Sequence, residues 1–242
     1  KQNESFVRYA AMTTHMDASI GKIIDYIEQT GQLENTIVIF LSDNGAVELE
    51  EGQSTGTQYA GFPLLTSWQL GSNDPLKGQK GTVYEGGIRT PAILYHKGKL
   101  APGKFTTPLS VVDWMPTLLN LAGYQSNRDL GFDGLDIWPL VSGKENELPE
   151  RSIYIRYIGG MYVVRKGNWK LIKPGNSEFA KGRMPGEDRS DRLYNIEKDP
   201  YEENNLASQH PDIVIELNRV LEEEKKKDMP LRDPVNEVFL SK

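Results

Sequence analysis

Cysteine is absent from the 242 residues of the sequence. Its absence excludes disulfide bonds, thiolate metal sites and a cysteine nucleophile within these residues. The compartment stays open on this ground, because a secreted chain can also lack disulfides. The sequence also lacks any run of about 18 apolar residues, so it contains no candidate for a membrane-spanning helix and we expect no membrane partner.

An excess of basic residues is lacking as well. Lysine and arginine number 28 against 34 aspartate and glutamate residues, which gives a formal net charge of −6. The charges are spread along the chain without a basic stripe, so we expect no nucleic acid partner. The 38% of hydrophobic and 26% of charged residues are typical of a globular protein with a core.

An amphipathic helix is predicted near the N-terminus. Ser5 is its expected N-cap and Gly31 its expected C-terminal stop. The segment before it contains neither an initiating methionine nor the apolar stretch of a signal peptide, which predicts a processed N-terminus or a piece of a longer protein. Apolar residues recur at every third or fourth position on one stripe of the helix: Tyr9, Met12, Met16, Ile20, Ile23 and Ile27.

Two adjacent oxygen donors follow a predicted buried strand. Residues 36–41 form an uninterrupted apolar run rich in β-branched side chains, typical of a strand covered on both faces in a parallel sheet. Ligands of such sheets bind at the carboxyl ends of strands, where Asp43 and Asn44 stand. Their carboxylate and amide oxygens suit Ca²⁺ or Mg²⁺. An ordinary turn is the alternative interpretation, because Asp-Asn-Gly is also a turn signal.

A glycine-rich block carries two lysines, Lys77 and Lys80. Glycine lets the backbone approach an anion closely, and an ammonium group there can hold a sulfate or phosphate oxygen. The alternative is a pair of solvated lysines in a flexible loop. Glu85 and Arg89 flank two glycines, and we expect them to fix that turn by pairing with each other or with the lysines.

The pattern changes at about residue 149. Short strand-like runs follow, with a hairpin turn expected at Gly167-Asn168, and a helix is predicted to begin at Pro211. Strands followed by one packing helix indicate a small α+β subdomain. We therefore expect an α/β domain over residues 1–148 and a subdomain with antiparallel strands over residues 149–242.

Two long polar loops, residues 46–76 and 174–191, are the expected determinants of specificity. Tyr59, Phe62 and Trp68 in the first loop can stack on a ring of a substrate or pack the loop onto its domain. The histidines are interpreted as surface or packing residues rather than ligands: His15, His96 and His210.

In their order along the chain, these motifs resemble the sulfatase family. The main blocks are Ser42-Asp43-Asn44-Gly45 and the stretch from Lys77 to Arg89, and the resemblance runs from about Tyr9 to Leu217. Further matching motifs occur at residues 111–119, 121–123, 133–134, 139–140, 169–172, 193–195, 199–200 and 205–207. So many motifs in one order make a chance match improbable.

The resemblance implies a partial alkaline-phosphatase-like α/β sheet covered by helices, and hydrolysis of sulfate esters. In the family, a calcium ion is held partly by an Asp-Asn pair that matches Asp43 and Asn44, and a lysine that matches Lys80 contacts the sulfate. The resemblance implies a sulfate-ester small molecule or a sulfated sugar as partner. It also implies an extracytoplasmic location, whether periplasmic, secreted or lysosomal.

The sequence departs from the family in lacking the nucleophile, the remaining carboxylate metal ligands, and the catalytic His and Lys, all of which the family carries in an N-terminal half. The family's nucleophile is a formylglycine made from Cys or Ser in a C/S-x-P-x-R context of an N-terminal half, and that pattern does not occur here. We therefore expect the C-terminal portion of an arylsulfatase-like enzyme, with an incomplete calcium site, no activity of its own, and the missing N-terminal half as partner. The alternatives are a folded non-catalytic fragment, or a phosphatase or phosphodiesterase of the same superfamily.

Overall fold

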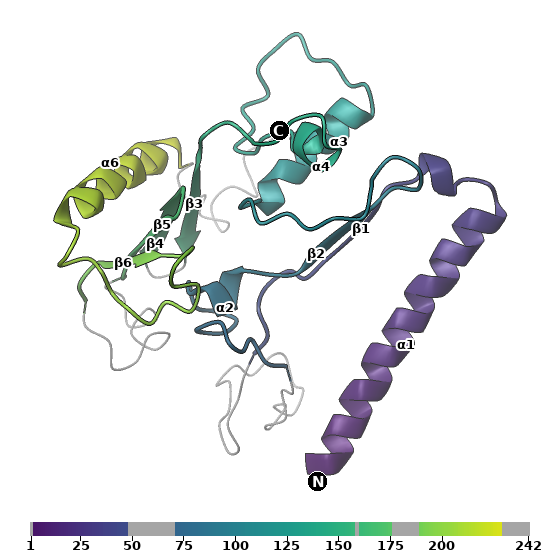
Figure 1. The fold of residues 1–242 in the computed structure, drawn as a ribbon, viewed down its shortest axis with the longest axis horizontal. Helices are drawn as coiled ribbons and strands as arrows, with labels where there is room; N and C mark the ends of the chain where they lie inside the picture. The colour runs from purple at the N-terminus through teal and green to yellow at the C-terminus, as the bar shows by residue number, and fades with distance from the viewer. Residues whose placement is uncertain (1, 48–70, 158–159, 176–188, 229–242) are drawn as a thin grey trace, which may run out of the picture. The chain divides into compact units, whose positions relative to one another are not determined.

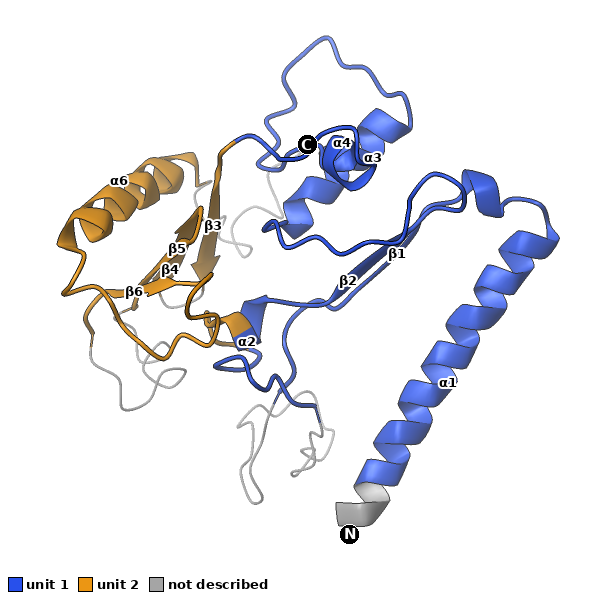
Figure 2. Ribbon diagram, viewed as in Figure 1, with its two compact units in different colours: residues 1–80, 86–149 blue, residues 81–85, 150–242 orange. Residues whose placement is uncertain are grey.

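The computed structural model describes residues 2–47, 71–157, 160–175 and 189–228 (Figure 1). Contacts divide the chain into two compact units, the first made of residues 1–80 and 86–149 and the second of residues 81–85 and 150–242 (Figure 2). The short segment 81–85 thus belongs to the second unit, which the sequence did not predict.

The first unit begins with the predicted helix, α1 (Gln2–Gln29). The helix starts before Ser5, so the expected N-cap was wrong, whereas Gly31 has a φ of +70° that suits the predicted stop. The apolar stripe is largely exposed, with Met12 72% and Ile23 60% accessible. The helix is therefore amphipathic in sequence, but the described residues do not cover its apolar stripe.

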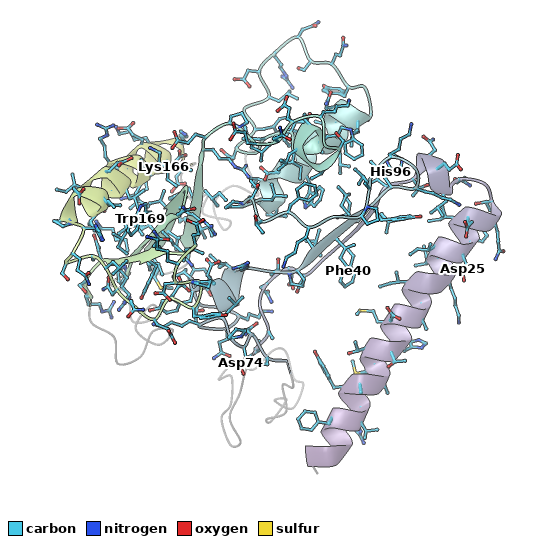
Figure 3. All side chains as sticks on the ribbon, in the orientation of Figure 1. Asp25, Phe40, Asp74, His96, Lys166 and Trp169 are labelled. Carbon is cyan, nitrogen blue, oxygen red and sulfur yellow. The ribbon has the colours of Figure 1, made fainter. Side chains whose placement is uncertain are left out.

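A two-stranded sheet follows in the same unit. Strand β1 (Val38–Leu41) pairs with β2 (Ala92–Tyr95) in antiparallel register, with Val38 opposite Tyr95. The expectation of a parallel strand buried on both faces was wrong for the described residues, since Phe40 (labelled in Figure 3) is exposed at 39%. An apolar run predicts a strand from its composition, but pairing direction and burial depend on distant segments.

Short helices complete the first unit. The helix η2 (Val111–Asp113) begins with a capping box, in which the Asp113 carboxylate accepts a hydrogen bond from the Ser110 backbone N–H at 2.7 Å. The same carboxylate also accepts a hydrogen bond from the Leu135 backbone N–H at 3.0 Å. The buried Asp113 thereby ties two loop segments together. The short helices are η1 (Leu33–Asn35), α2 (Glu85–Ile88, shared between the units), η2 (Val111–Asp113), α3 (Trp114–Leu121) and α4 (Trp138–Val141).

The second unit contains the predicted α+β arrangement. Four antiparallel strands lie in sequence order, and the expected turn at Gly167 has a φ of +55°. The elements are β3 (Ser152–Tyr157), β4 (Met161–Lys166), β5 (Trp169–Lys173), β6 (Arg192–Asn195) and the helix α6 (Pro211–Lys227). The fold therefore combines helices with antiparallel sheets.

The two faces of this sheet are covered by different segments. Helix α6 packs on one face, where Lys166 and Trp169 (labelled in Figure 3) also lie. Its cluster contains Val164, Leu171, Leu193, Leu217 and Leu221. Val83 and Tyr84 pack on the other face with Met161, Val163, Ile172, Tyr194 and Ile196. Alternation along the strands produces this two-sided burial.

We expect Leu221→Ala to destabilise the chain by about 2–5 kcal/mol, because Leu221 is fully buried against the sheet and its loss leaves a cavity. The matched control is Ile215→Ala on the same helix, whose side chain is 72% exposed and which should change stability little. Urea unfolding of both variants measures the difference. Equal destabilisation by the two substitutions would contradict the packing of α6.

Candidate functional site

The Asp43-Asn44 turn comes directly after β1, as the sequence predicted. The Asp43 Oδ1 accepts a hydrogen bond from the Asn44 backbone N–H at 3.0 Å, and Ser42 Oγ donates to the Asn44 carbonyl oxygen at 2.9 Å. Asn44 Nδ2 donates to the Gly45 carbonyl oxygen at 3.0 Å. This bond uses the amide nitrogen and not the amide oxygen, which is the atom that can serve as a ligand.

Backbone hydrogen bonds join this turn to the lysine block. The Lys80 N–H donates to the Ala46 carbonyl oxygen at 2.9 Å, and the Gly45 N–H donates to the Gly87 carbonyl oxygen at 3.0 Å. Within the block, the Gly86 N–H donates to the Lys77 carbonyl oxygen at 2.7 Å. Two motifs that lie more than 30 residues apart in the sequence are therefore held in one place.

Asn73 links the same segments, and sequence reasoning missed it. Its Oδ1 accepts from the Ala46 N–H at 2.7 Å, and its Nδ2 donates to the carbonyl oxygens of Ala46 at 2.9 Å and Gly78 at 3.3 Å. One amide side chain thus satisfies backbone groups of both motifs. The local signal, an asparagine within Ser72-Asn73-Asp74-Pro75, indicates only a turn.

Two glycines permit this close approach. A Cβ placed on Gly45 would collide with the carbonyl oxygen of Gly86. A Cβ on Gly86 would come within 2.6 Å of the Lys77 carbonyl oxygen and 2.9 Å of the Leu76 carbonyl oxygen. No real side chain tolerates such contacts with backbone, so both positions need glycine for space rather than for φ.

The two lysines of the block differ in exposure. The Lys80 side chain is exposed, whereas Lys77 is half-buried. The backbone of Lys80 is anchored through Ala46 while its ammonium group remains open to solvent or ligand. This arrangement can present a positive charge to an anion close to the Asp43-Asn44 turn.

The oxygen donors at Asp43 and Asn44 fit part of a calcium site. Calcium takes about 6–8 oxygen ligands, and a carboxylate with an amide oxygen is a suitable pair of hard donors. No group of three or more His, Cys, Asp or Glu residues placed to hold a metal occurs within the described residues. This pair can therefore contribute to a calcium site but needs further ligands.

Of the other residues singled out in the sequence, two histidines make packing contacts, and the three loop aromatics lie outside the described residues. His96 Nε2 lies 3.0 Å from the Glu34 carbonyl oxygen and its ring packs on Trp138 with centroids 5.9 Å apart. His210 packs on Trp169 at 5.1 Å, and both contacts agree with the packing interpretation. Tyr59, Phe62 and Trp68 lie outside the described residues, as does the 176–188 part of the second polar loop.

Comparison with protein families finds a match over the first half of this chain. A family model described as "Sulfatase" matches residues 1–124. Arylsulfatase J of Mus musculus is 32% identical over 94% of this chain and 41% of its own length. N-acetylgalactosamine-6-O-sulfatase of Bacteroides thetaiotaomicron is 30% identical over 86% of this chain and 40% of its own length. The chain thus spans about two fifths of the curated relatives that it matches.

Solved structures agree with these relatives. One, from work on the metabolism of multiple glycosaminoglycans by Bacteroides thetaiotaomicron, superposes with a TM-score of 0.68 at 28% identity, over 87% of this chain and 43% of that one. Another, Ps i-CgsB in complex with k-i-k-neocarrahexaose, has a TM-score of 0.69 at 26% identity, over 89% of this chain and 42% of that one. The expected α/β fold class, with antiparallel strands in the C-terminal part, agrees with these structures.

Proposed function

The chain belongs to the sulfatase family, and we propose that it is the C-terminal part of an arylsulfatase-like sulfuric ester hydrolase. In this proposal Lys80 binds the sulfate group, and Asp43 and Asn44 are ligands of a calcium ion. The observation that carries it is the hydrogen bond from the Lys80 N–H to the Ala46 carbonyl oxygen, which anchors the lysine beside the Asp43-Asn44 turn.

The roles of these residues follow from charge. A calcium ion, when bound, supplies positive charge that favours the binding of a sulfate ester. Asp43 and Asn44 would hold such an ion through a carboxylate oxygen and an amide oxygen, and the hydrogen bond from Asn44 Nδ2 to the Gly45 carbonyl oxygen restrains the amide. The ammonium group of Lys80 stabilises negative charge on the sulfate oxygens, and Asn73 holds both motifs in register.

We further propose that an N-terminal half, absent from these 242 residues, completes the enzyme. That half would supply the formylglycine nucleophile and the remaining calcium ligands. The exposed apolar stripe of α1 supports this proposal, since an amphipathic helix needs a covering surface. Apolar side chains are exposed on α1 and on the β1–β2 pair: Phe6, Val7, Tyr9, Met12, Met16, Ile23, Tyr26, Phe40, Leu41, Ile93 and Tyr95.

The proposed substrate is a sulfated sugar or an aryl sulfate. The names of two relatives point to sulfated N-acetylgalactosamine and to aryl sulfates, and one structural neighbour holds a neocarrahexaose. An extracytoplasmic location is part of the same proposal. None of the helices in the described residues is long and apolar enough to cross a membrane.

The test is hydrolysis of p-nitrophenyl sulfate against p-nitrophenyl phosphate by the full-length protein that contains this chain. We expect the sulfate ester to have the higher kcat/KM, and the isolated 242-residue chain to hydrolyse neither, because it lacks the nucleophile. Preference for the phosphate ester would indicate a phosphatase of the same superfamily. Turnover of the sulfate by the pure isolated chain would contradict the placement of the nucleophile.

A further inference from the structure

Three ionisable side chains are buried together in the second unit. Lys170 Nζ lies 2.9 Å from Glu85 Oε1 and 2.8 Å from Glu202 Oε1, and all three side chains are at most 4% exposed. Buried charges are costly unless they are paired at close range. Lys170 therefore joins two segments that are far apart in the sequence, one carrying Glu85 and the other Glu202.

The register of the sheet explains why Lys170 lies there. On β5, Lys170 and Ile172 face the cluster that contains Val83 and Tyr84, while Leu171 and Lys173 face α6. Lys170 lies opposite Arg165 of β4, whose guanidinium is 3.9 Å from Glu85 Oε2. The two cations and two carboxylates balance in charge.

The network also holds backbone. Glu202 Oε2 accepts a hydrogen bond from the Glu85 backbone N–H at 2.6 Å, so Glu85 is held through both its side chain and its main chain. Glu202 itself has a φ of +55°, an uncommon conformation for a residue with a side chain. Asp199 supports this turn by accepting hydrogen bonds from the N–H groups of Glu203 and Asn204 at 3.1 and 2.8 Å.

The held segment adjoins the proposed sulfate-binding block. Lys80 precedes the segment 81–85 directly, and Gly86, which is packed against the Lys77 carbonyl oxygen, follows it. We propose that Lys170 and Glu202 are positioning residues for this block: by fixing Glu85 they set the path of the chain on both sides of it. The inference rests on the proposed function of Lys80, and neither residue is assigned contact with substrate.

The variant that tests this is Lys170→Met, which removes the charge at nearly constant length. Its matched control is Lys173→Met, on the same strand but with its ammonium group bonded to Asn218 at 2.9 Å on the α6 side. We expect Lys170→Met to lower kcat/KM of the full-length protein for p-nitrophenyl sulfate about tenfold or more, because misplaced binding groups lose rate steeply. Lys173→Met should stay within about twofold of wild type, as surface substitutions usually do, and Lys170→Arg should recover most of the loss.

Hydrogen exchange of the isolated chain gives a readout that does not depend on activity. Exchange of the backbone amides in residues 81–87 should be faster in Lys170→Met, while the amides of α6 keep their wild-type protection. If Lys170→Met does not fold, Glu202→Gln provides the same comparison, because it removes the charge but keeps an acceptor for the Glu85 N–H.

The outcomes separate the two proposals. A full-length protein without activity on sulfate esters would overturn the proposed function, while the exchange data would still decide the role of Lys170. Wild-type kcat/KM and wild-type exchange in residues 81–87 of Lys170→Met would overturn the positioning role. Equal acceleration of exchange in residues 81–87 and in α6 would also overturn it, because it would show general destabilisation of the unit.

Discussion

Replacing Lys80 with alanine in the full-length protein is expected to lower kcat/KM for p-nitrophenyl sulfate by roughly 10²-fold or more, the scale for losing one preorganised electrostatic contact. The reason is the anchored backbone of Lys80 beside the Asp43-Asn44 turn, combined with its exposed ammonium group. Stability should change little, because an exposed lysine contributes little to folding. Steady-state kinetics and thermal melting of the same preparation measure both effects.

The control for this substitution is Lys104→Ala, another exposed lysine of the first unit, outside both motifs. It makes the same change in charge, so any general electrostatic effect on substrate binding appears in both variants. A Lys80→Ala enzyme with the kcat/KM of Lys104→Ala would remove Lys80 from the site.

Gly45→Ala in the full-length protein is also expected to lower kcat/KM for p-nitrophenyl sulfate by roughly 10²-fold, for a different reason. The added Cβ would meet the Gly86 carbonyl oxygen and lie 3.0 Å from Asn73 Oδ1, so the turn and the lysine block must move apart. Overpacking of this kind costs about 1–3 kcal/mol of stability. A displacement of about 1 Å at a site can cost 10²-fold in rate, so kcat/KM should fall further than stability alone explains.

Gly103→Ala is the matched control, because nothing lies within 4 Å of a Cβ at that position. Chemical denaturation and kinetics on both variants separate the loss of folded protein from the loss of geometry. A Gly45→Ala protein with wild-type kcat/KM would show that the close approach of the two motifs is unnecessary for activity.

Patterns within a few residues of sequence predicted several helices, turns and strand ends. The apolar period of α1, the turn at Gly167 and the helix that begins at Pro211 were all confirmed. The position of Asp43 and Asn44 after a strand was also confirmed, since a polar pair that ends an apolar run marks the end of the strand. These features arise from backbone sterics and periodicity within a few residues.

Features that depend on distant partners could not be predicted in the same way. The antiparallel pairing of β1 with β2 and the exposure of its side chains depend on a segment more than 50 residues away. Asn73 bonds across 27 residues to Ala46. Glu85 pairs with Lys170, 85 residues further along, a partner that no local pattern indicates. Charge and polarity identify such residues as candidates, but only the fold selects their partners.

The calcium dependence of activity in the full-length protein tests the proposed site most directly. The comparison is wild type, Asp43→Ala and the control Asp25→Ala, an exposed aspartate of α1 (labelled in Figure 3). If Asp43 is a calcium ligand, the calcium concentration that gives half-maximal hydrolysis of p-nitrophenyl sulfate should be at least about tenfold higher for Asp43→Ala than for wild type. The reason is that even residues that only support metal ligands change metal affinity by about 10–100-fold. Asp25→Ala should match wild type. The same calcium requirement in Asp43→Ala and wild type would contradict the assignment of the Asp43-Asn44 turn as a metal site.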